Sequence, residues 1–171
     1  MKNKTLLFII LGIGYALAFT SCEKPDSEIE WGFAKIYMPQ ANYAPYITTT
    51  EQPGATCRID QTNNELKIYL GVYRSGLQEL KEFSVDVVAE PGQVENAVDL
   101  PASVYTLPAQ VTCPDGNRDV TFYLKVDLAF LQENIDTDYT IAVAIQNPTN
   151  YELNEDLSTT QILIKPSELL N

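Results

Sequence analysis

The stretch Leu66-Lys67-Ile68-Tyr69-Leu70-Gly71-Val72-Tyr73 decides the fold of this 171-residue chain. Its apolar residues occupy every second position, and successive side chains of a β-strand point to opposite faces. The stretch therefore predicts a strand with one face on a hydrophobic core. The same alternation recurs in Phe83 to Ala89, Val120 to Val126 and Tyr139 to Ile145, and it ends at Ile162 and Ile164.

Turn-forming residues separate these runs and indicate short strands joined by loops. They include Pro53-Gly54, Ser75-Gly76, Pro91-Gly92, Asp115-Gly116 and Asn147-Pro148. Because helical periodicity is limited to one turn at Leu128 to Gln132, we expect an all-β fold, an antiparallel immunoglobulin-like β-sandwich of about seven strands. The Asp115-Gly116 turn predicts a hairpin between its two neighbouring strands. We expect the core to contain Phe83, Val85, Phe122, Leu124, Ile141 and Val143.

Tyr139 stands at the start of an alternating run, after a short crossover. This is the placement of a tyrosine corner in immunoglobulin-like folds. The alternative is that Tyr139 is only the first core residue of its strand. Both interpretations predict a central strand at this point.

Residues 1–21 have the pattern of a cleaved signal peptide. Two lysines precede a mostly apolar run from Leu6 to Phe19, and Ser21 comes directly before Cys22. As a helix, this run reaches about 21 Å, short of the roughly 30 Å hydrocarbon core of a bilayer. The pattern resembles the bacterial lipobox, in which the chain is cut before the cysteine and the thiol is acylated, which implies lipidation of Cys22. A retained membrane anchor and a plain cleaved signal are the alternatives.

Residues 22–30 are acidic and contain Pro25, so we expect a solvated tether. One immunoglobulin-like domain is predicted to follow over residues 31–171. Acidic residues behind the lipidated cysteine resemble the export signal that sends Bacteroidetes lipoproteins to the outer face of the outer membrane. The predicted location is therefore the outer membrane, with a lipid anchor and the domain facing the exterior. The alternative is an ordinary polar linker on a periplasmic leaflet.

The composition excludes several classes of function. The chain has 23 acidic and 11 basic residues and no histidine. Without residues 1–21, which carry two of the lysines and no acid, the formal charge is −14. Such a surface repels nucleic acid, so partners are expected to be neutral or cationic. Histidine is the commonest general base and metal ligand, and no local pattern places two carboxylates in one pocket. We therefore expect no enzymatic activity, no cofactor and no metal.

Two weaker signals leave alternatives open. Cys57 and Cys113 are an even pair that an exported domain can join in a disulfide, which stabilises by roughly 4 kcal/mol; the alternative is two buried free thiols. Asp136 with Asp138, and the segment from Asn150 to Asp156, are rich in oxygen ligands. Neither has the spacing of a known calcium loop, so solvated turns are favoured.

Three motifs carry a resemblance to a protein family. They are Val72-Tyr73-Arg74-Ser75-Gly76, Leu100-Pro101-Ala102-Ser103-Val104-Tyr105-Thr106-Leu107 and Asn147-Pro148-Thr149-Asn150-Tyr151-Glu152-Leu153-Asn154. In this order and spacing they resemble an uncharacterised family of N-terminal, immunoglobulin-like domains in Bacteroidetes surface lipoproteins, over nearly all of Trp31 to Lys165. Those domains precede a second module, such as a lectin-like domain or a chitinase-like glycosidase, often within polysaccharide-utilisation gene clusters. This chain ends at Asn171 without such a module, which argues against a role as a mere spacer.

Aromatic residues point to binding as the function. Sugars have apolar C–H faces and polar rims, which suit an aromatic ring beside amides or carboxylates. The candidate ligand-binding residues are Trp31, Asn42, Tyr43 and Tyr46. Tyr69, Tyr73 and Tyr123 fall on outward positions of their strands, where the alternative to binding is cross-strand pairing.

Two functions from different classes follow. The first is a non-catalytic, cell-surface lipoprotein that binds glycan or is an accessory component of polysaccharide utilisation. The second is a structural or adhesive surface subunit that docks protein partners through a sheet edge. A third, suggested by the charge alone, is an inhibitor of cationic proteins.

Overall fold

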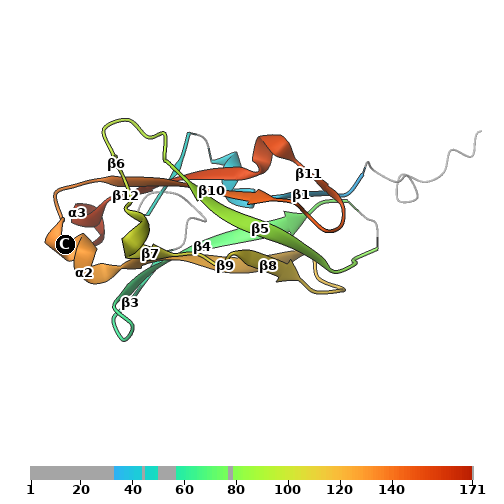
Figure 1. Ribbon diagram of the computed structural model, residues 1–171, viewed down its shortest axis with the longest axis horizontal. Helices are drawn as coiled ribbons and strands as arrows, with labels where there is room; N and C mark the ends of the chain where they lie inside the picture. Colours follow the sequence, from blue (N-terminus) through green and yellow to red (C-terminus); the bar gives the residue numbers. More distant parts are fainter. Residues whose placement is uncertain (1–32, 44, 50–56, 77–78, 171) are drawn as a thin grey trace, which may run out of the picture. The chain divides into compact units, whose positions relative to one another are not determined.

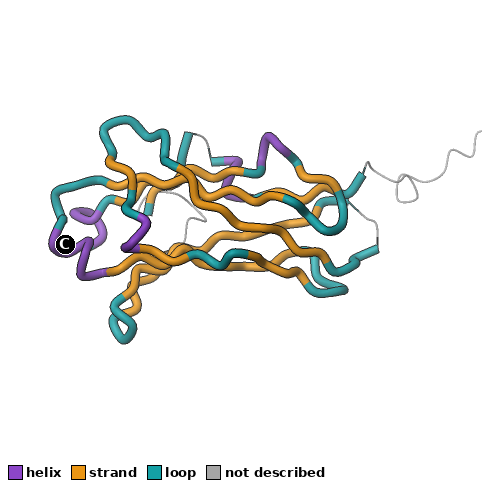
Figure 2. The backbone as a smooth tube through the Cα atoms, viewed as in Figure 1, coloured by secondary structure: helices purple, strands orange, loops and turns teal. Residues whose placement is uncertain are grey.

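The computed structural model describes residues 33–43, 45–49, 57–76 and 79–170. The signal peptide, the tether, Cys22 and Trp31 lie outside these described residues. The described part forms two β-sheets that pack face to face around one hydrophobic core (Figure 1). Among the described residues, helix is confined to short segments between strands and to one turn after the last strand (Figure 2). None of the helices in the described ranges is long and apolar enough to span a membrane.

One sheet, here called the β4 sheet, has the strand order β11-β1-β4-β9-β7, with β3 also paired to β4. Its strands are β1 (Lys35–Tyr37), β3 (Cys57–Asp60), β4 (Glu65–Arg74), β7 (Tyr105–Thr106), β9 (Asp119–Asp127) and β11 (Glu152–Leu153). The longest ladder joins β4 to β9 in antiparallel register, from Glu65 opposite Asp127 to Tyr73 opposite Asp119.

The other sheet, the β10 sheet, has the order β2-β12-β10-β5-β8, with β6 also paired to β10. Its strands are β2 (Ile47–Thr48), β5 (Phe83–Glu90), β6 (Val98–Asp99), β8 (Gln110–Cys113), β10 (Tyr139–Gln146) and β12 (Thr159–Ile164). Four helical segments connect strands: η2 (Pro39–Asn42), η3 (Ala102–Val104), α2 (Leu128–Glu133) and η4 (Glu155–Leu157). A fifth, α3 (Pro166–Leu169), follows β12.

The predicted strand register is confirmed. All six expected core residues, Phe83, Val85, Phe122, Leu124, Ile141 and Val143, are buried. In β4, Leu66 to Val72 alternate between buried and half-buried positions, as the period of two requires. The core is therefore formed by the inward positions of both sheets.

Two details of the predicted architecture are wrong. The described residues contain twelve strands rather than about seven, because several edge strands have only two or three residues and are too short to display an alternation. Three edge pairs are parallel rather than antiparallel: β1 with β11, β2 with β12 and β6 with β10.

The predicted hairpin at Asp115-Gly116 is also wrong. The turn is present, with Gly116 at φ +80°, but β8 pairs with β5 and β9 pairs with β4. The segment therefore carries the chain from one sheet to the other. A turn motif defines the local reversal, whereas the sheet that each strand joins depends on distant partners.

Tyr139 opens β10 and is buried, with its ring 5.1 Å from that of Phe130 in a tilted arrangement. This contact supports its role as the first core residue of the strand. The predicted helical turn forms α2, whose first turn is capped by the side chain of Asp127 accepting from the Ala129 amide at 2.9 Å.

The two cysteines are free thiols in the structure, which is the second of the two alternatives. Cys57 lies in β3 and Cys113 in β8, in different sheets, and both are unbonded. The Cys57 thiol donates to the Thr49 carbonyl at 2.8 Å. Burial raises the pKa of both thiols, which keeps them protonated and weakly nucleophilic.

Candidate functional site

Of the predicted binding residues, Tyr46 lines a cleft. This Tyr46 cleft has a volume of about 520 Å³ and is lined by Pro45, Tyr46, Gln93, Val94, Glu95, Asn96 and Gln161. Asn42 and Tyr43 are not among its lining residues. The Asn42 amide instead donates to the Pro39 carbonyl at 3.2 Å within its own helical turn, and the Tyr43 ring is exposed.

One wall of the cleft is built by the edge of the β10 sheet. Tyr46 directly precedes β2, and the parallel pairing of Ile47 with Ile162 places it beside Gln161 of β12. The Gln161 side chain is half-buried on the outer face of the sheet. Its carbonyl oxygen accepts a hydrogen bond from the backbone N–H of Gln93 at 3.0 Å. This bond ties the second wall to the first.

The second wall is the connection from β5 to β6, residues 91–97. It lies close to β10 because Gly92 has no side chain: a Cβ atom there would come within 2.1 Å of the Thr140 hydroxyl oxygen. The Gly92 amide donates to the Asp99 carboxylate at 2.9 Å, and Asn96 adopts a left-handed φ of +63°. These local constraints hold the loop over the sheet.

The lining of the cleft suits a neutral, hydroxyl-rich ligand. It offers one tyrosine ring, the amides of Gln93, Asn96 and Gln161, and a single carboxylate, Glu95. Its volume falls in the range of about 300–1,000 Å³ typical of small-molecule sites. Glycoside hydrolysis normally needs a pair of carboxylic acids, and the lining supplies one. The arrangement is thus suited to binding by stacking and hydrogen bonds.

A second aromatic surface lies on the outer face of the β4 sheet. Tyr69 and Tyr123 are directly opposite on β4 and β9, with ring centroids 4.8 Å apart in an edge-to-face arrangement. Tyr37 and Tyr73 are also directly opposite, on β1 and β4, with ring centroids 5.4 Å apart in a tilted arrangement. The predicted cross-strand pairing of outward tyrosines is confirmed, and Tyr123 remains exposed.

Ion pairs join side chains of β3, β4 and β9 on the same sheet. The Lys67 ammonium lies 2.6 Å from the Asp60 carboxylate, and Lys125 lies 3.6 Å from Glu65. The bond from Lys67, together with those from Asn63, holds the pKa of Asp60 well below its usual range. These opposite charges compensate one another locally.

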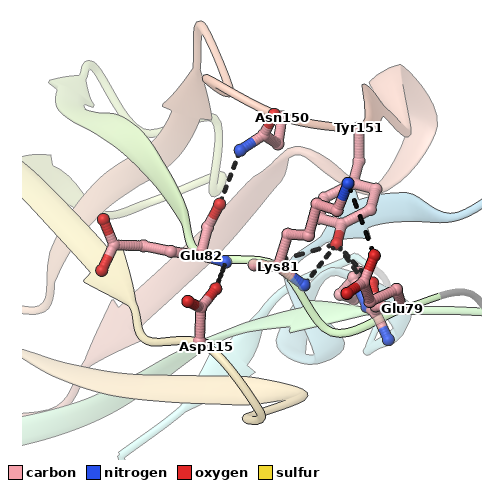
Figure 3. Close-up of polar contacts among 7 residues, drawn as sticks. Glu79, Lys81, Glu82, Asp115, Asn150 and Tyr151 are labelled. Carbon is pink, nitrogen blue, oxygen red and sulfur yellow. Dashed lines mark hydrogen bonds and ion pairs between the residues drawn. The ribbon is translucent and has the colours of Figure 1, made fainter.

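Tyr151 has a structural role that sequence reasoning placed only loosely. Its hydroxyl donates to the Glu79 carbonyl at 2.7 Å and accepts from the Lys81 amide at 2.8 Å (Figure 3). It also accepts from the fully buried Arg74 at 3.0 Å. A left-handed φ of +68° at Tyr151 aims the ring at this point. The period of two, continued past Val72, places Arg74 at the last inward position of β4, and the structure buries it there.

The neighbouring Asn150 takes part in the same cluster. Its amide donates to the Glu82 carbonyl at 2.6 Å, and the Glu82 amide donates to the Asp115 carboxylate (Figure 3). The first residues of the segment from Asn150 to Asp156 therefore bind the connection between β4 and β5, and Glu152–Leu153 form β11 of the β4 sheet. Within the described ranges, no group of three or more potential metal ligands comes together.

Fold and site together define a β-sandwich domain with a cleft beside the edge of one sheet, lined in part by three amide-bearing residues. The model of a family described as an N-terminal domain matches residues 33–152, and the chain belongs to this family. The resemblance inferred from the three motifs is thereby confirmed. None of the curated proteins matches the sequence.

Solved structures are similar to this chain at low sequence identity. One is a protein from Bacteroides ovatus described as a "putative carbohydrate binding protein", with 9% identity, a TM-score of 0.51 and coverage of 77% of this chain. Another, of unknown function and also from Bacteroides ovatus, has 17% identity, a TM-score of 0.46 and coverage of 67%. This chain spans 36% and 42% of their respective lengths. The apo-form CBD1 domain of Calx has 14% identity, a TM-score of 0.47 and coverage of 78% of this chain and 97% of that domain.

Proposed function

We propose that this protein is a non-catalytic glycan-binding lipoprotein of the bacterial cell surface, acting alone or as an accessory component of polysaccharide utilisation. The observation that carries the proposal is the Tyr46 cleft, whose lining combines a tyrosine with three amide-bearing residues and one carboxylate-bearing residue. A pyranose ring presents apolar C–H faces to an aromatic ring and hydroxyl groups to amides. The cleft therefore matches the chemistry of a neutral sugar.

The shared fold supports the same class of ligand. The Bacteroides ovatus protein to which carbohydrate binding is ascribed has the same type of sandwich over 77% of this chain. The family match adds that the domain is of a kind found at the N-terminus of longer proteins. Both are consistent with a domain that presents a glycan to other proteins.

The proposed location depends on Cys22. If its thiol is acylated, replacement of Cys22 with Ala abolishes lipidation and releases the protein from the membrane fraction. Carbonate washing of membranes, followed by detection of the protein in the pellet, measures this release. A variant that still pellets would exclude the lipoprotein interpretation.

The cleft is tested by comparing two tyrosines that lie three residues apart. We expect Tyr46→Ala to weaken retention on a glycan array about tenfold, as the loss of one stacking contact predicts. Tyr43→Ala is the matched control, because Tyr43 is exposed and outside the cleft. Both variants should keep a melting temperature within a few degrees of the wild type.

Two outcomes would contradict the proposal. Unchanged retention of Tyr46→Ala would remove the cleft as the binding site. Failure of the wild-type protein to bind any plant or host glycan on the array would remove glycan binding as the function.

A further inference from the structure

The outer edge of β9 is open over most of its length. On one side, β9 pairs with β4 along all nine residues of its length. On the other side, β7 covers only two positions, with Tyr105 opposite Val126 and Thr106 opposite Lys125. Among the described residues, no strand pairs with this edge from Asp119 to Leu124.

The register shows which backbone groups face that edge. The Arg74 amide donates to the Arg118 carbonyl at 2.8 Å, and the Leu128 amide donates to the Asn64 carbonyl at 2.9 Å. Both bonds continue the β4–β9 register, so even-numbered residues of β9 are hydrogen-bonded to β4. In an antiparallel ladder, the alternate residues direct their N–H and C=O groups to the opposite side. Thr121 and Tyr123 therefore present their backbone groups to the open edge.

The sequence explains why β7 stops where it does. Continuing the register of Thr106 with Lys125 would place Pro108 opposite Tyr123. Proline has no N–H to donate to the Tyr123 carbonyl. By Ala109, whose carbonyl accepts from the Val87 amide at 3.0 Å, the chain has crossed to the β10 sheet. The edge is thus left open by a proline and a sheet change.

A cleft of about 380 Å³ lies along this edge. Its lining residues are Thr106, Leu107, Pro108, Thr121, Phe122, Tyr123 and Lys125. The Tyr123 ring is 38% exposed and is held in place by its edge-to-face contact with Tyr69. Among the described residues, this edge thus combines unpaired backbone groups with a partly apolar cleft. Strand addition uses both features: the backbone gives affinity, and the pocket receives alternate side chains.

We propose that this edge binds an extended peptide segment of another protein as an added strand of the β4 sheet. The segment pairs with the backbone of Thr121 and Tyr123 and places an apolar side chain in the cleft. Charge selects the partner: the whole chain has a formal charge of −12, which disfavours a second copy and favours a segment with alternating apolar and basic residues. This surface is separate from the Tyr46 cleft and does not depend on glycan binding.

Hydrogen exchange resolved to single amides tests the inference on the full chain. In the free protein, the amides of Thr121 and Tyr123 should exchange at least about 100-fold faster than those of Phe122 and Leu124, which are bonded to β4. An eight-residue peptide of alternating valine and lysine is the probe. At millimolar concentration it should slow exchange at Thr121 and Tyr123 by about tenfold, while a peptide of alternating valine and glutamate should not.

A substitution at the edge provides a matched pair. Thr121→Pro removes the N–H that faces the probe and leaves the bonds to β4 intact, so it should abolish protection of Tyr123. Thr121→Val keeps the N–H and should retain protection. The glycan retention of both variants should equal that of the wild type, which separates failure of this inference from failure of the proposed function.

Three results would overturn the inference. Equal protection of Thr121 and Phe122 in the free monomer would show that the edge is closed. Protection that rises with protein concentration alone would make a second copy the occupant. Absence of protection by the valine–lysine peptide, or equal protection by the valine–glutamate peptide, would exclude the proposed partner chemistry.

Discussion

The central strands of the two sheets, β4 and β10, bury their side chains differently. Along β4, buried inward residues alternate with half-buried outward ones. Along β10, seven of eight residues are buried, and the outward Thr140, Ala142 and Ala144 are only 1–3% exposed. The two strands share a hydrophobic period but differ in their outer faces. The outer face of β4 is partly exposed and is called the bare face here, and the buried outer face of β10 is called the covered face.

At Thr140, the cover on β10 is a connecting loop rather than a second layer of secondary structure. Gly92 sits directly on Thr140, and Gln93 is tied to Gln161 of the neighbouring strand. Small outward side chains on β10 leave room for this loop, whereas tyrosines occupy the same positions on β4. The covered face thereby gains a walled cleft, and the bare face keeps paired tyrosines beside an open edge.

The largest expected change in stability comes from a substitution in the core, which the inner faces of both sheets form together. Phe122→Ala should lower the free energy of unfolding by about 3–5 kcal/mol, because Phe122 is buried in the core and leaves a cavity. Its neighbour Tyr123→Ala, on the bare face, should cost less than about 1 kcal/mol. Chemical denaturation measures both values, and similar losses for the two would mean that the assigned register is wrong.

Alanine substitutions at two glycines compare the covered and bare outer faces. Gly92 lies against the covered face, and Gly71 lies on the bare face. Gly92→Ala should lower stability by about 1–3 kcal/mol, since its Cβ would overlap the buried Thr140 side chain. Gly71→Ala on β4 is the control, because the nearest atom to its Cβ would be 3.8 Å away. Thermal unfolding of the two variants provides the measurement. A Gly71→Ala variant as unstable as Gly92→Ala would contradict the difference between the faces.

The last inward-facing residue differs between the two central strands. In β4 it is the charged Arg74, and in β10 it is the apolar Ile145. Tyr151→Phe removes the hydroxyl that bonds Arg74 and the Lys81 amide, which should cost about 1–2 kcal/mol. Tyr43→Phe, at an exposed position, should be neutral. Urea denaturation at neutral pH checks this, and equal stability of the two variants would show that the hydroxyl contributes nothing.

The smallest effect concerns pH and the ion pairs on the bare face. The pKa of Asp60 is lowered mainly by its hydrogen bond from Lys67, so the stabilisation is fully present above the unfolded value of about 3.9. It is lost as the pH falls through the depressed folded pKa, so it disappears only in strong acid. Lys67→Met should return the pKa of Asp60 toward its ordinary value in an NMR titration. A pKa that does not move would assign the shift to Asn63 instead.

Much of the fold could be predicted because alternation is a local property. The runs around Leu70, Val85, Phe122 and Val143 each predicted a strand, and all of them are strands with the expected face buried. Two-residue strands such as β6 and β7 have no period to read, so the count of strands was too low. The hairpin expected at Asp115-Gly116 failed because partner choice depends on residues far away in the chain.

The candidate site was predictable only in part. Tyr46 was chosen because a tyrosine in a proline-containing loop is unlike a core residue, and it does line a cleft. Gln93, Asn96 and Gln161 were missed, because exposed amides occur on every protein surface and only the pairing of β2 with β12 brings them to Tyr46. The Pro91-Gly92 turn was the one available signal for the opposite wall.

The sequence by itself determined the all-β class, the inward face of each long strand and the acidic net charge, because side-chain period and composition need no tertiary contacts. Tertiary structure alone decided which outer face is covered, where the amides meet Tyr46 and which edge of β9 stays open. These features depend on the packing of residues far apart in the chain, such as Gln93 with Gln161, 68 positions apart, and Met38 with Thr160, 122 positions apart. A local pattern specifies the shape of one strand, and only the folded chain specifies its neighbours.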